Sequence, residues 1–390
     1  MTARMRQAAA TAGLEAELVH PGALSADDVA TWRALQTTEP AFASPLLGVD
    51  FAQAVGAVRA DARVAIYRRG GQTIGFLAHH RRPGGFARPI GAPFCDYHAL
   101  ISRGDAALGA AEALQAARLG ALRLTGLIDP FDGFGEAVKT RMPAHRIVLS
   151  GTSQAYLDGL WAGSGNRLKN YRRYRRSLEK AAGPIRVVGD DRDPEAFGTL
   201  LAWKSEQFER TGLHDFLAVP WAAALMRRVF EERSASFGGQ MLSLYAGSRL
   251  VAAHFGARQD GWFHPWISAF DPDLRAHSPG TVHQVEAIGA MTGLGLTTYD
   301  LGPGEDHWKQ QFTNGDETIG AGLAIAPNFA GALARSSDQF WALPPLRDAA
   351  LVGRVRNRLD QIAALELTLG GRMQGAAYAL TTQRRRQWAA

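Results

Sequence analysis

The chain has 390 residues, of which 46% are hydrophobic and 21% are charged. This composition is typical of a globular protein and excludes a disordered, collagen-like or low-complexity chain, while the length predicts two domains. The single cysteine, Cys95, cannot form an internal disulfide, and no cysteine and histidine cluster has zinc-ligand spacing. We therefore expect a reducing compartment and no metal.

The formal net charge of +6 is concentrated in two short stretches. Residues 151–182 and residues 331–390 each carry five more basic than acidic side chains, and most basic residues are arginine. Because a bias toward arginine can arise from GC-rich coding, without selection for anion binding, the overall charge does not predict a nucleic-acid partner.

Neither a secretory signal nor a membrane-spanning segment is indicated. Residues 1–19 are rich in alanine but interrupted by charged side chains, and they lack the apolar stretch of a secretory signal. The most apolar run, residues 319–334, contains Pro327 and is shorter than the about 20 residues that cross a bilayer. We expect a cytoplasmic protein.

The first part of the chain alternates between helix and strand patterns. Ser25, with Asp28 three residues later, predicts a capped helix start, and a second helix is expected over 45–60. Two β-rich runs around Gly70 and Gly71 predict a hairpin. A helix over 105–119 and strands over 121–125 and 146–150 follow.

The same order then returns, which predicts a duplicated α/β unit. A helical stretch over 153–182, a strand over 185–188, helices over 194–210 and 220–234, and a hairpin over 241–255 repeat the pattern. The two hairpins align at an offset of 178 residues, and the ends of the helices that follow them align at an offset of 175 residues. We expect a mixed α/β fold with units at 15–150 and 151–345 and a helical segment at 346–390.

The second unit offers a candidate anion site at a helix start. A strand over 262–270 is followed by a helix from Ser278, which would supply the N-cap oxygen, with Pro279 at the first helical position. Backbone N–H groups around Gly280 and Thr281 are suited to a pyrophosphate, with no Walker-type lysine. An ordinary helix start is the alternative.

Polar residues follow the next strand, over 296–301. Asp300 and His307 are candidate proton acceptors there, because sites in α/β proteins lie at the carboxyl ends of strands. His254, on the hairpin, is a further candidate base, and a core histidine with satisfied hydrogen bonds is the alternative.

Together these motifs resemble a known family. The residues that carry the resemblance are Asp271-Pro-Asp, Ser278-Pro-Gly280, Gly295-Leu, Tyr299-Asp-Leu-Gly302, Gly304-Glu-Asp and Trp308-Lys309. Their order is similar to that of the tandem GCN5-related acetyltransferases typified by bacterial cellulose-biosynthesis acetyltransferases, and to the FemAB peptidoglycan transferases. The resemblance is strongest over 240–320. One departure is that Ser-Pro-Gly replaces the family's phosphate loop, an Arg or Gln followed by Gly-x-Gly or Gly-x-Ala.

The resemblance implies an acyl-CoA cleft between the strands at 261–270 and 296–301, with acetyl-CoA or another acyl-CoA as co-substrate. It places the pyrophosphate at Ser278, Gly280 and Thr281, and it implies transfer to an amine with Asp300 as proton acceptor and His254 second. The implied acceptor is an amino sugar, a polysaccharide or a lipid-linked precursor of exopolysaccharide or holdfast synthesis. The candidate acceptor-site residues are Trp266, Asp271, Glu305, His307, Trp308 and Lys309.

Two basic segments have an open role. Residues 166–180 predict an amphipathic helix on which Arg172 and Arg176 are candidate anion ligands, and the tail carries Arg384, Arg385 and Arg386. A solvated helix face and a passive tail are the alternatives to peripheral contact with the inner face of a membrane. Two other functions also remain open: a FemAB-like transferase that uses aminoacyl-tRNA, and a non-catalytic sensor of an anion such as a cyclic dinucleotide.

Overall fold

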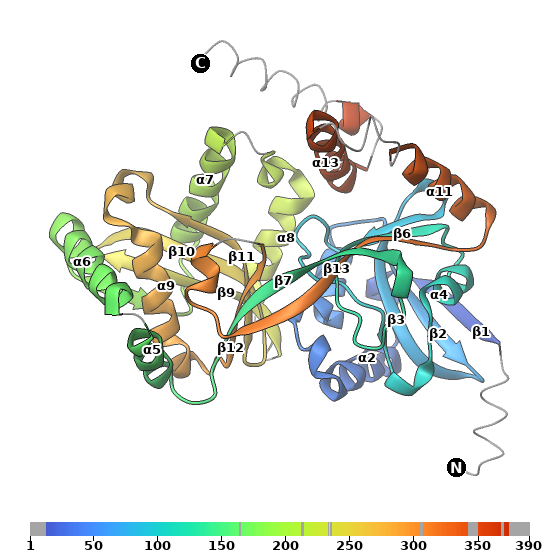
Figure 1. The fold of residues 1–390 in the computed structure, drawn as a ribbon, viewed down its shortest axis with the longest axis horizontal. Helices are drawn as coiled ribbons and strands as arrows, with labels where there is room; N and C mark the ends of the chain where they lie inside the picture. The colour runs from blue at the N-terminus through green and yellow to red at the C-terminus, as the bar shows by residue number, and fades with distance from the viewer. Residues whose placement is uncertain are drawn as a thin grey trace. The chain divides into compact units, whose positions relative to one another are not determined.

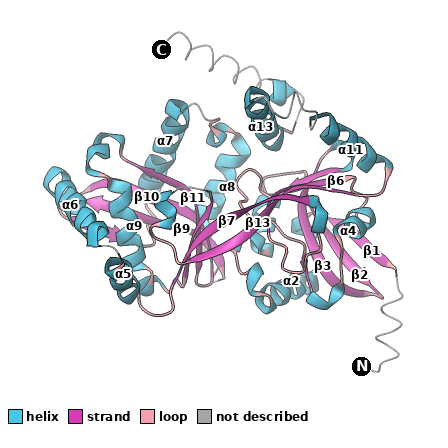
Figure 2. Cartoon of the chain, in the orientation of Figure 1, coloured by secondary structure: helices cyan, strands magenta, loops and turns pink. Residues whose placement is uncertain are grey.

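The computed structural model describes residues 13–163, 165–211, 214–232, 234, 236–304, 307–341, 350–367 and 370–373. The chain divides into two compact units (Figure 1). Unit 1 comprises Met1–Met142 and Thr318–Ala390, and unit 2 comprises Pro143–Glu317. Each unit combines a mixed β-sheet with helices (Figure 2), so the predicted α/β class is confirmed.

The unit boundaries differ from the expected ones at 150 and 345. Strand β7 (Val138–Val148) runs from unit 1 into unit 2, and strand β13 (Gly315–Ile325) runs from unit 2 into unit 1. The expected boundaries missed this because local sequence patterns do not show which strand pairs with which. The helices after β13, expected as a separate segment from 346, belong to unit 1.

Unit 1 has the strand order β1-β2-β3-β4-β6-β13, with the short β5 paired to β3. Ser25 Oγ accepts the Asp28 N–H at the start of α2, which confirms the predicted cap. The elements of this unit, besides β13, are β1 (Leu14–Val19), α2 (Ala26–Thr38), α3 (Val49–Gly56), β2 (Ala62–Arg69), β3 (Gln72–Arg81), β4 (Phe86–Pro89), β5 (Ile101–Ser102), α4 (Ala110–Ala116), β6 (Ala121–Leu127), α11 (Phe329–Trp341) and α13 (Ala350–Leu365).

Unit 2 has the strand order β7-β12-β11-β10-β9-β8. The helical stretch expected over 153–182 forms two helices, α5 and α6, instead of one. The elements of this unit, besides β7, are α5 (Ser153–Ala162), α6 (Gly165–Ala182), β8 (Ile185–Val188), α7 (Pro194–Thr211), α8 (Pro220–Glu231), β9 (Phe237–Ala246), β10 (Arg249–Gln259), β11 (Trp262–Phe270), α9 (Pro279–Ala290), β12 (Thr298–Pro303) and α10 (His307–Gln310).

The two units share one topology. Each has an antiparallel hairpin with a β-bulge near its turn, and the residues that open the returning strands, Gln72 and Arg249, lie 177 positions apart. In each, a helix then connects two parallel strands, β4 to β6 and β11 to β12. The last strand of each sheet, β13 or β7, is antiparallel to its neighbour. This common order supports the predicted duplication.

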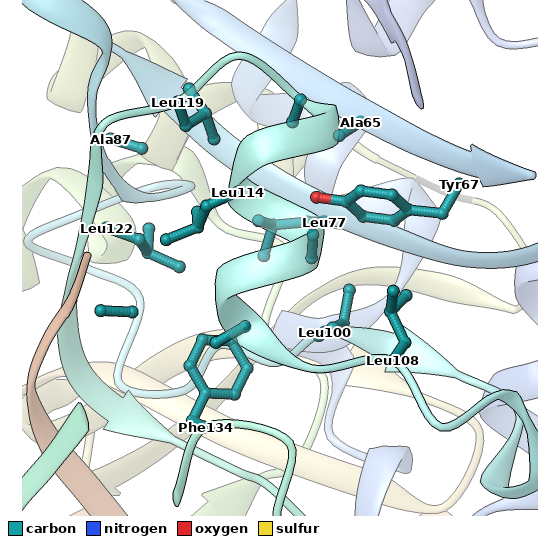
Figure 3. Packing of buried hydrophobic residues seen from close by; sticks show 14 of the residues in the cluster. Ala65, Tyr67, Leu77, Ala87, Leu100, Leu108, Leu114, Leu119, Leu122 and Phe134 are labelled. Carbon is teal, nitrogen blue, oxygen red and sulfur yellow. The ribbon is translucent and has the colours of Figure 1, made fainter. Parts of the chain in front are cut away.

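The core of unit 1 forms around α4, which packs on the sheet (Figure 3). Alanine and leucine side chains on one face of this helix, Ala113 and Leu114 among them, meet Leu77 and Leu122 from the strands. Burial of these apolar groups stabilises the sheet by about 25 cal/mol for each Å² removed from water. No helix in the part of the chain described here is long and apolar enough to cross a membrane.

His98, buried in unit 1, makes stability dependent on pH. Burial lowers its pKa to about 3, and its Nε2 accepts the Thr125 N–H, so the folded state holds it neutral while the unfolded chain binds a proton below about pH 6.5. Its contribution is present above pH 6.5 and is lost as the pH falls toward 3. Between pH 7 and pH 5, protonation of this histidine in the unfolded chain should lower the free energy of unfolding by about 2 kcal/mol. We expect His98→Asn to abolish this part of the decrease. Urea titrations at both pH values measure this, and an unchanged pH dependence would contradict it.

Candidate functional site

The parallel strands β11 and β12 of unit 2 pair only briefly. Trp262 lies opposite Thr298 and Phe263 opposite Tyr299, and the two strands separate after these pairs. A short 3-10 helix, residues 272–277, then leads from the end of β11 to the N-terminus of α9. The parting of the strands, and the helix start that follows it, are at the place where the sequence predicted a site.

The start of α9 is built differently from the expectation. Pro279 is the first helical residue, as predicted, but Ser278 has a left-handed backbone with φ of 52° and its side chain makes no capping hydrogen bond. The Ser278 carbonyl accepts the N–H groups of Thr281 and Val282 instead. Because Pro279 has no N–H, a phosphate at this turn would rely chiefly on Gly280 N–H.

Helix α6 lies beside this turn. Ser177 of α6 forms a hydrogen bond of 2.8 Å with Nδ1 of His277, one residue before Ser278. Arg172 and Arg176 are exposed on α6, as the amphipathic pattern predicted. The start of α9 is itself a suitable environment for an anion, and α6, which carries these arginines, contacts the segment before it.

A buried cluster of polar rings lies at the parting. Nδ1 of His254, on β10, shares a hydrogen bond with the Tyr299 hydroxyl of β12, and the His254 ring lies 4.2 Å from that of His283 on α9. Burial lowers the pKa of His254 well below 6.5 and raises that of Tyr299 well above 10. Both side chains are therefore neutral near pH 7, and one proton lies between them.

Lys204, on α7, is a further cation near this cluster. It donates to the carbonyl of Ser268, and Ser268 lies opposite His254 in the β10–β11 register. Burial lowers the pKa of Lys204, and its positive charge contributes to the low pKa of His254. The surroundings of His254 thus favour its neutral form.

Asp300 lies on the opposite face of the sheet from Tyr299, because neighbouring residues of a strand point to opposite sides. It is fully buried, its Oδ1 accepts the Gly302 N–H at 2.8 Å, and its Oδ2 lies 3.5 Å from Nε of Arg146 and 3.6 Å from Nδ1 of His264. The structure therefore does not bring together the two bases that the sequence suggested, Asp300 and His254.

The candidate acceptor-site residues have varied surroundings. Asp271 is engaged by Arg249 at 2.6 Å, and Lys309 donates to the Pro303 carbonyl at 2.7 Å, so both have structural contacts. Trp308 is 45% exposed, and Trp266 on β11 lies edge-on to Phe255. His307 begins α10. Glu305, Arg384, Arg385 and Arg386 lie outside the described residues.

Comparison with known proteins agrees with this geometry. Residues 165–310 match the family model described as the acetyltransferase (GNAT) domain. Unit 2 therefore contains a GNAT domain. The duplicated topology, together with this domain, supports the tandem GNAT architecture that the sequence motifs predicted, and the domain supports an acyltransferase activity. No curated protein matches the chain.

Two solved structures are similar to this chain. The crystal structure of FemX has a TM-score of 0.50 at 12% identity, over 82% of this chain and 99% of the other. A tandem GNAT protein from the clavulanic acid biosynthesis pathway has a TM-score of 0.46 at 14% identity, over 81% and 99% of the two chains. At this identity the similarity to FemX concerns the fold alone.

Sequence reasoning missed three residues of the GNAT domain that the structure places beside His254. Tyr299 had a detectable signal, since it precedes Asp300 on a strand predicted to border the cleft. His283 and Lys204 lie on helices, α9 and α7, whose approach to His254 follows from tertiary packing. No local pattern marks either of them. Among the described residues, no group of histidine, cysteine and acidic side chains is suited to hold a metal ion.

Proposed function

We propose that the protein is an acyl-CoA-dependent N-acyltransferase whose site lies at the parting of β11 and β12. The observation that supports this most directly is the pairing of His254 with Tyr299 at the last paired residues of the two strands. A candidate proton acceptor, the parting of two parallel strands and a helix start suited to phosphate all lie in unit 2. In acyl transfer from acyl-CoA to an amine, these features would accept the proton, admit the thioester and hold the phosphates.

In the proposed reaction the neutral amine attacks the thioester carbonyl, so that a C–N bond forms and the C–S bond breaks. The amine proton moves to the Tyr299 oxygen while the tyrosine proton moves to Nδ1 of His254, and the leaving thiolate recovers a proton by the reverse path. Gly280 N–H, with the basic side chains of α6, would hold the phosphates. Asp300 would orient Arg146 and His264 on the other face.

For the acceptor we propose an amino sugar or an amine-bearing polysaccharide precursor. The exposed indole of Trp308 is of a kind that stacks on sugar rings, and it lies on α10 directly after β12. The choice of this acceptor class rests mainly on the family resemblance. The test is release of free thiol from acetyl-CoA with glucosamine and related amines, followed by mass spectrometry of the product.

An aminoacyl-tRNA donor is the second candidate, which the exposed basic face of α6 and the FemX-like fold favour. In that case aminoacyl-tRNA would support transfer, ribonuclease would abolish it, and acetyl-CoA would give no thiol release. The two candidates therefore differ in their donor, and one assay with both donors separates them.

Gly280 offers a sharp test of the phosphate position. A Cβ at this residue would meet the Phe270 ring at 3.6 Å, an ordinary contact, and an acidic side chain at the second position of α9 favours the helix. We therefore expect Gly280→Asp to fold normally while raising the Kd for CoA by about tenfold or more, because its carboxylate would face the phosphates.

Gly280→Asn is the matched control, since it has the same shape without the charge, and it should keep the Kd within about threefold of the wild type. Isothermal titration with CoA measures both variants. Equal affinities for the aspartate and asparagine variants would place the phosphates elsewhere.

A further inference from the structure

Unit 1 contains a cleft of about 300 Å³. It lies where β4 and β6 part after the pairs of Phe86 with Ala121 and Ala87 with Leu122, and α11 and α13 complete its walls. Its lining combines apolar and charged side chains, and consists of Phe86, Arg123, Leu323, Ala334, Ser337, Asp338, Leu359, Asp360 and Ala363.

This cleft occupies the position in unit 1 that the parting of β11 and β12 occupies in unit 2. Arg88 and Arg123 each follow the last paired residue of β4 or β6, as His264 and Asp300 follow those of β11 and β12. Leu323 of β13 lies opposite Arg123, just as Arg146 of β7 lies opposite Asp300. Unit 1 therefore has the same parting of two parallel strands as unit 2. The first residues after its last pair, Arg88 and Arg123, are cationic.

A carboxylate of the chain itself is bound to these arginine side chains. Asp360 of α13 accepts two hydrogen bonds from Arg88, at 2.8 and 3.1 Å, and lies 3.6 Å from Arg123. The Arg88 guanidinium also lies over the Phe86 ring, 5.6 Å from its centroid. Two hydrogen bonds to one guanidinium are the geometry with which arginine recognises the carboxylates and phosphates of ligands.

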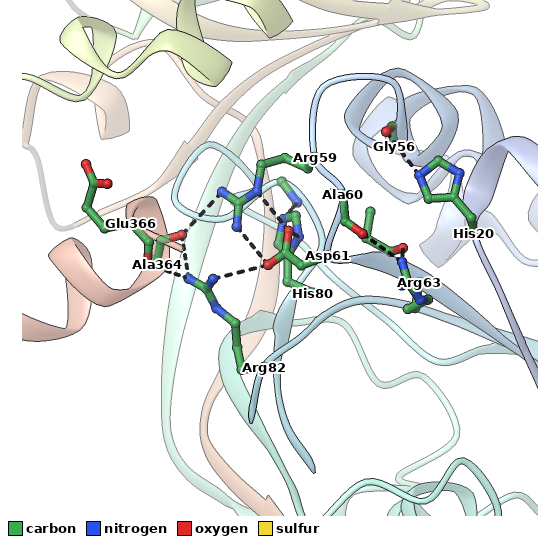
Figure 4. Close-up of polar contacts among 12 residues, drawn as sticks. His20, Gly56, Arg59, Ala60, Asp61, Arg63, His80, Arg82, Ala364 and Glu366 are labelled. Carbon is green, nitrogen blue, oxygen red and sulfur yellow. Dashed lines mark hydrogen bonds and ion pairs between the residues drawn. The ribbon is translucent and has the colours of Figure 1, made fainter. Parts of the chain in front are cut away.

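The end of α13 is held by more arginine side chains (Figure 4). Arg59 and Arg82 donate to the Ala364 carbonyl, at 3.4 and 3.1 Å, while both also contact Asp61. Four arginines thus surround two carboxylates, Asp61 and Asp360, and the partial negative charge of a helix C-terminus offsets part of the remaining charge. Removal of Asp360 would leave Arg88 and Arg123 without this carboxylate on the wall of the cleft.

We propose that the cleft of unit 1 is a second binding site, for a small phosphate- or carboxylate-bearing molecule with an apolar or aromatic part, and that the Asp360 carboxylate competes with this molecule for the same arginines. The anionic group binds Arg88 and Arg123 in place of Asp360. The apolar part contacts Phe86, Leu323 and Leu359. Binding displaces the Asp360 carboxylate and loosens α13, so that occupancy of the cleft determines how firmly α13 is held.

The test uses phenyl phosphate and benzoate as probes, with isothermal titration on the full chain. Asp360→Asn removes the competing charge and keeps the side-chain shape, so we expect it to bind one of the probes at least about tenfold more tightly than the wild type. The double variant Asp360→Asn, Arg123→Gln should lose that gain. The preferred probe distinguishes a phosphate ligand from a carboxylate ligand.

Asp338→Asn is the matched control, because Asp338 also lines the cleft but takes no part in the Arg88–Asp360 pair. A gain in affinity equal to that of Asp360→Asn would show a general charge effect and overturn the proposal. So would equal binding by the Asp360→Asn variant and the wild type.

A measurement on the wild type keeps the proposal testable if the Asp360→Asn variant does not fold. Saturating phenyl phosphate or benzoate should speed trypsin cleavage within residues 350–365 at least about threefold, because α13 is released. Sodium chloride at the same ionic strength is the control. Unchanged cleavage with both probes would contradict the proposal.

Discussion

Replacing His254 by asparagine should lower kcat for acyl transfer by at least about 100-fold, a typical loss when a general base is removed. The asparagine side chain still reaches the Tyr299 hydroxyl but cannot accept a proton near neutral pH. Its amide preserves hydrogen bonding in a site where His254 is only 8% exposed, so the fold should be retained. Steady-state rates with acetyl-CoA and the best amine acceptor, together with circular dichroism, measure both effects.

Tyr299→Phe tests the proposed proton relay separately. It removes only the hydroxyl that contacts Nδ1 of His254, and we expect a clear loss of kcat with little change in KM. The matched control is Tyr245→Phe, which removes the hydrogen bond from a tyrosine to Asp191 on the same sheet and should leave kcat within about threefold. Similar losses in the two tyrosine variants would indicate a general loss of stability and contradict the relay.

The pH dependence gives a further readout of the same base. Because burial lowers the pKa of His254 well below 6.5, the histidine keeps its neutral, proton-accepting form as the pH falls through 6.5. The acid limb of kcat should therefore lie below pH 6.5, provided that the amine acceptor has a low pKa. With such an acceptor, an acid limb centred at 6.5 or above would assign the base to another group.

The sequence ranked Asp300 ahead of His254 as proton acceptor, and from their surroundings we propose the reverse order. Asp300 is enclosed by Arg146, His264 and the Gly302 N–H, so it can accept a proton only by giving up charged partners. We therefore expect the main effect of Asp300→Asn to be a lower free energy of unfolding for unit 2. At a temperature where the variant is folded, its effect on kcat should be small.

The duplicated α/β fold was predictable because hairpins and helix starts are local patterns. The Ser25 cap and the turn at Gly70 and Gly71 are encoded within a few residues and appear as predicted. The exchange of β7 and β13 between the units was not predictable, because it depends on pairing between residues far apart, such as Leu323 with Arg123. The unit boundaries shifted for the same reason.

The site was predictable only in part. The resemblance pointed to the strands over 261–270 and 296–301 and to the helix start at Ser278, but it could not show that Ser278 adopts a left-handed backbone or that its side chain leaves the helix uncapped. It also could not show which residues of β12 lie on the same face of the sheet as His254. Asp300 and Tyr299 are neighbours in sequence, and the choice between them depends on which side of β12 carries His254, which only the packing of α9 reveals.

Asp61→Asn should destabilise unit 1 by about 3–5 kcal/mol, the usual cost of removing one partner from a buried ion pair. Asp61 accepts hydrogen bonds from Arg59 at 2.9 Å and from His80 at 3.1 Å, and it lies 3.2 Å from Arg82. The Arg59 side chain is fully buried, so asparagine would leave its charge without compensation and would weaken the grip on α13. Urea denaturation at pH 7 measures the loss.

The matched control and the pH dependence separate this network from a general effect of losing a charge. Asp50→Asn removes an ion pair with Arg33, whose side chain is 50% exposed, and should cost less than about 1 kcal/mol. Burial by itself raises the pKa of Asp61, but the hydrogen bonds from His80 and Arg59 outweigh it and hold that pKa well below 3.8. The stability that Asp61 contributes is therefore present above about pH 4 and is lost as the pH falls through its folded pKa. The difference between wild type and Asp61→Asn should accordingly shrink below pH 4, and a difference that stays constant from pH 7 to pH 3 would show that the carboxylate charge is not its source.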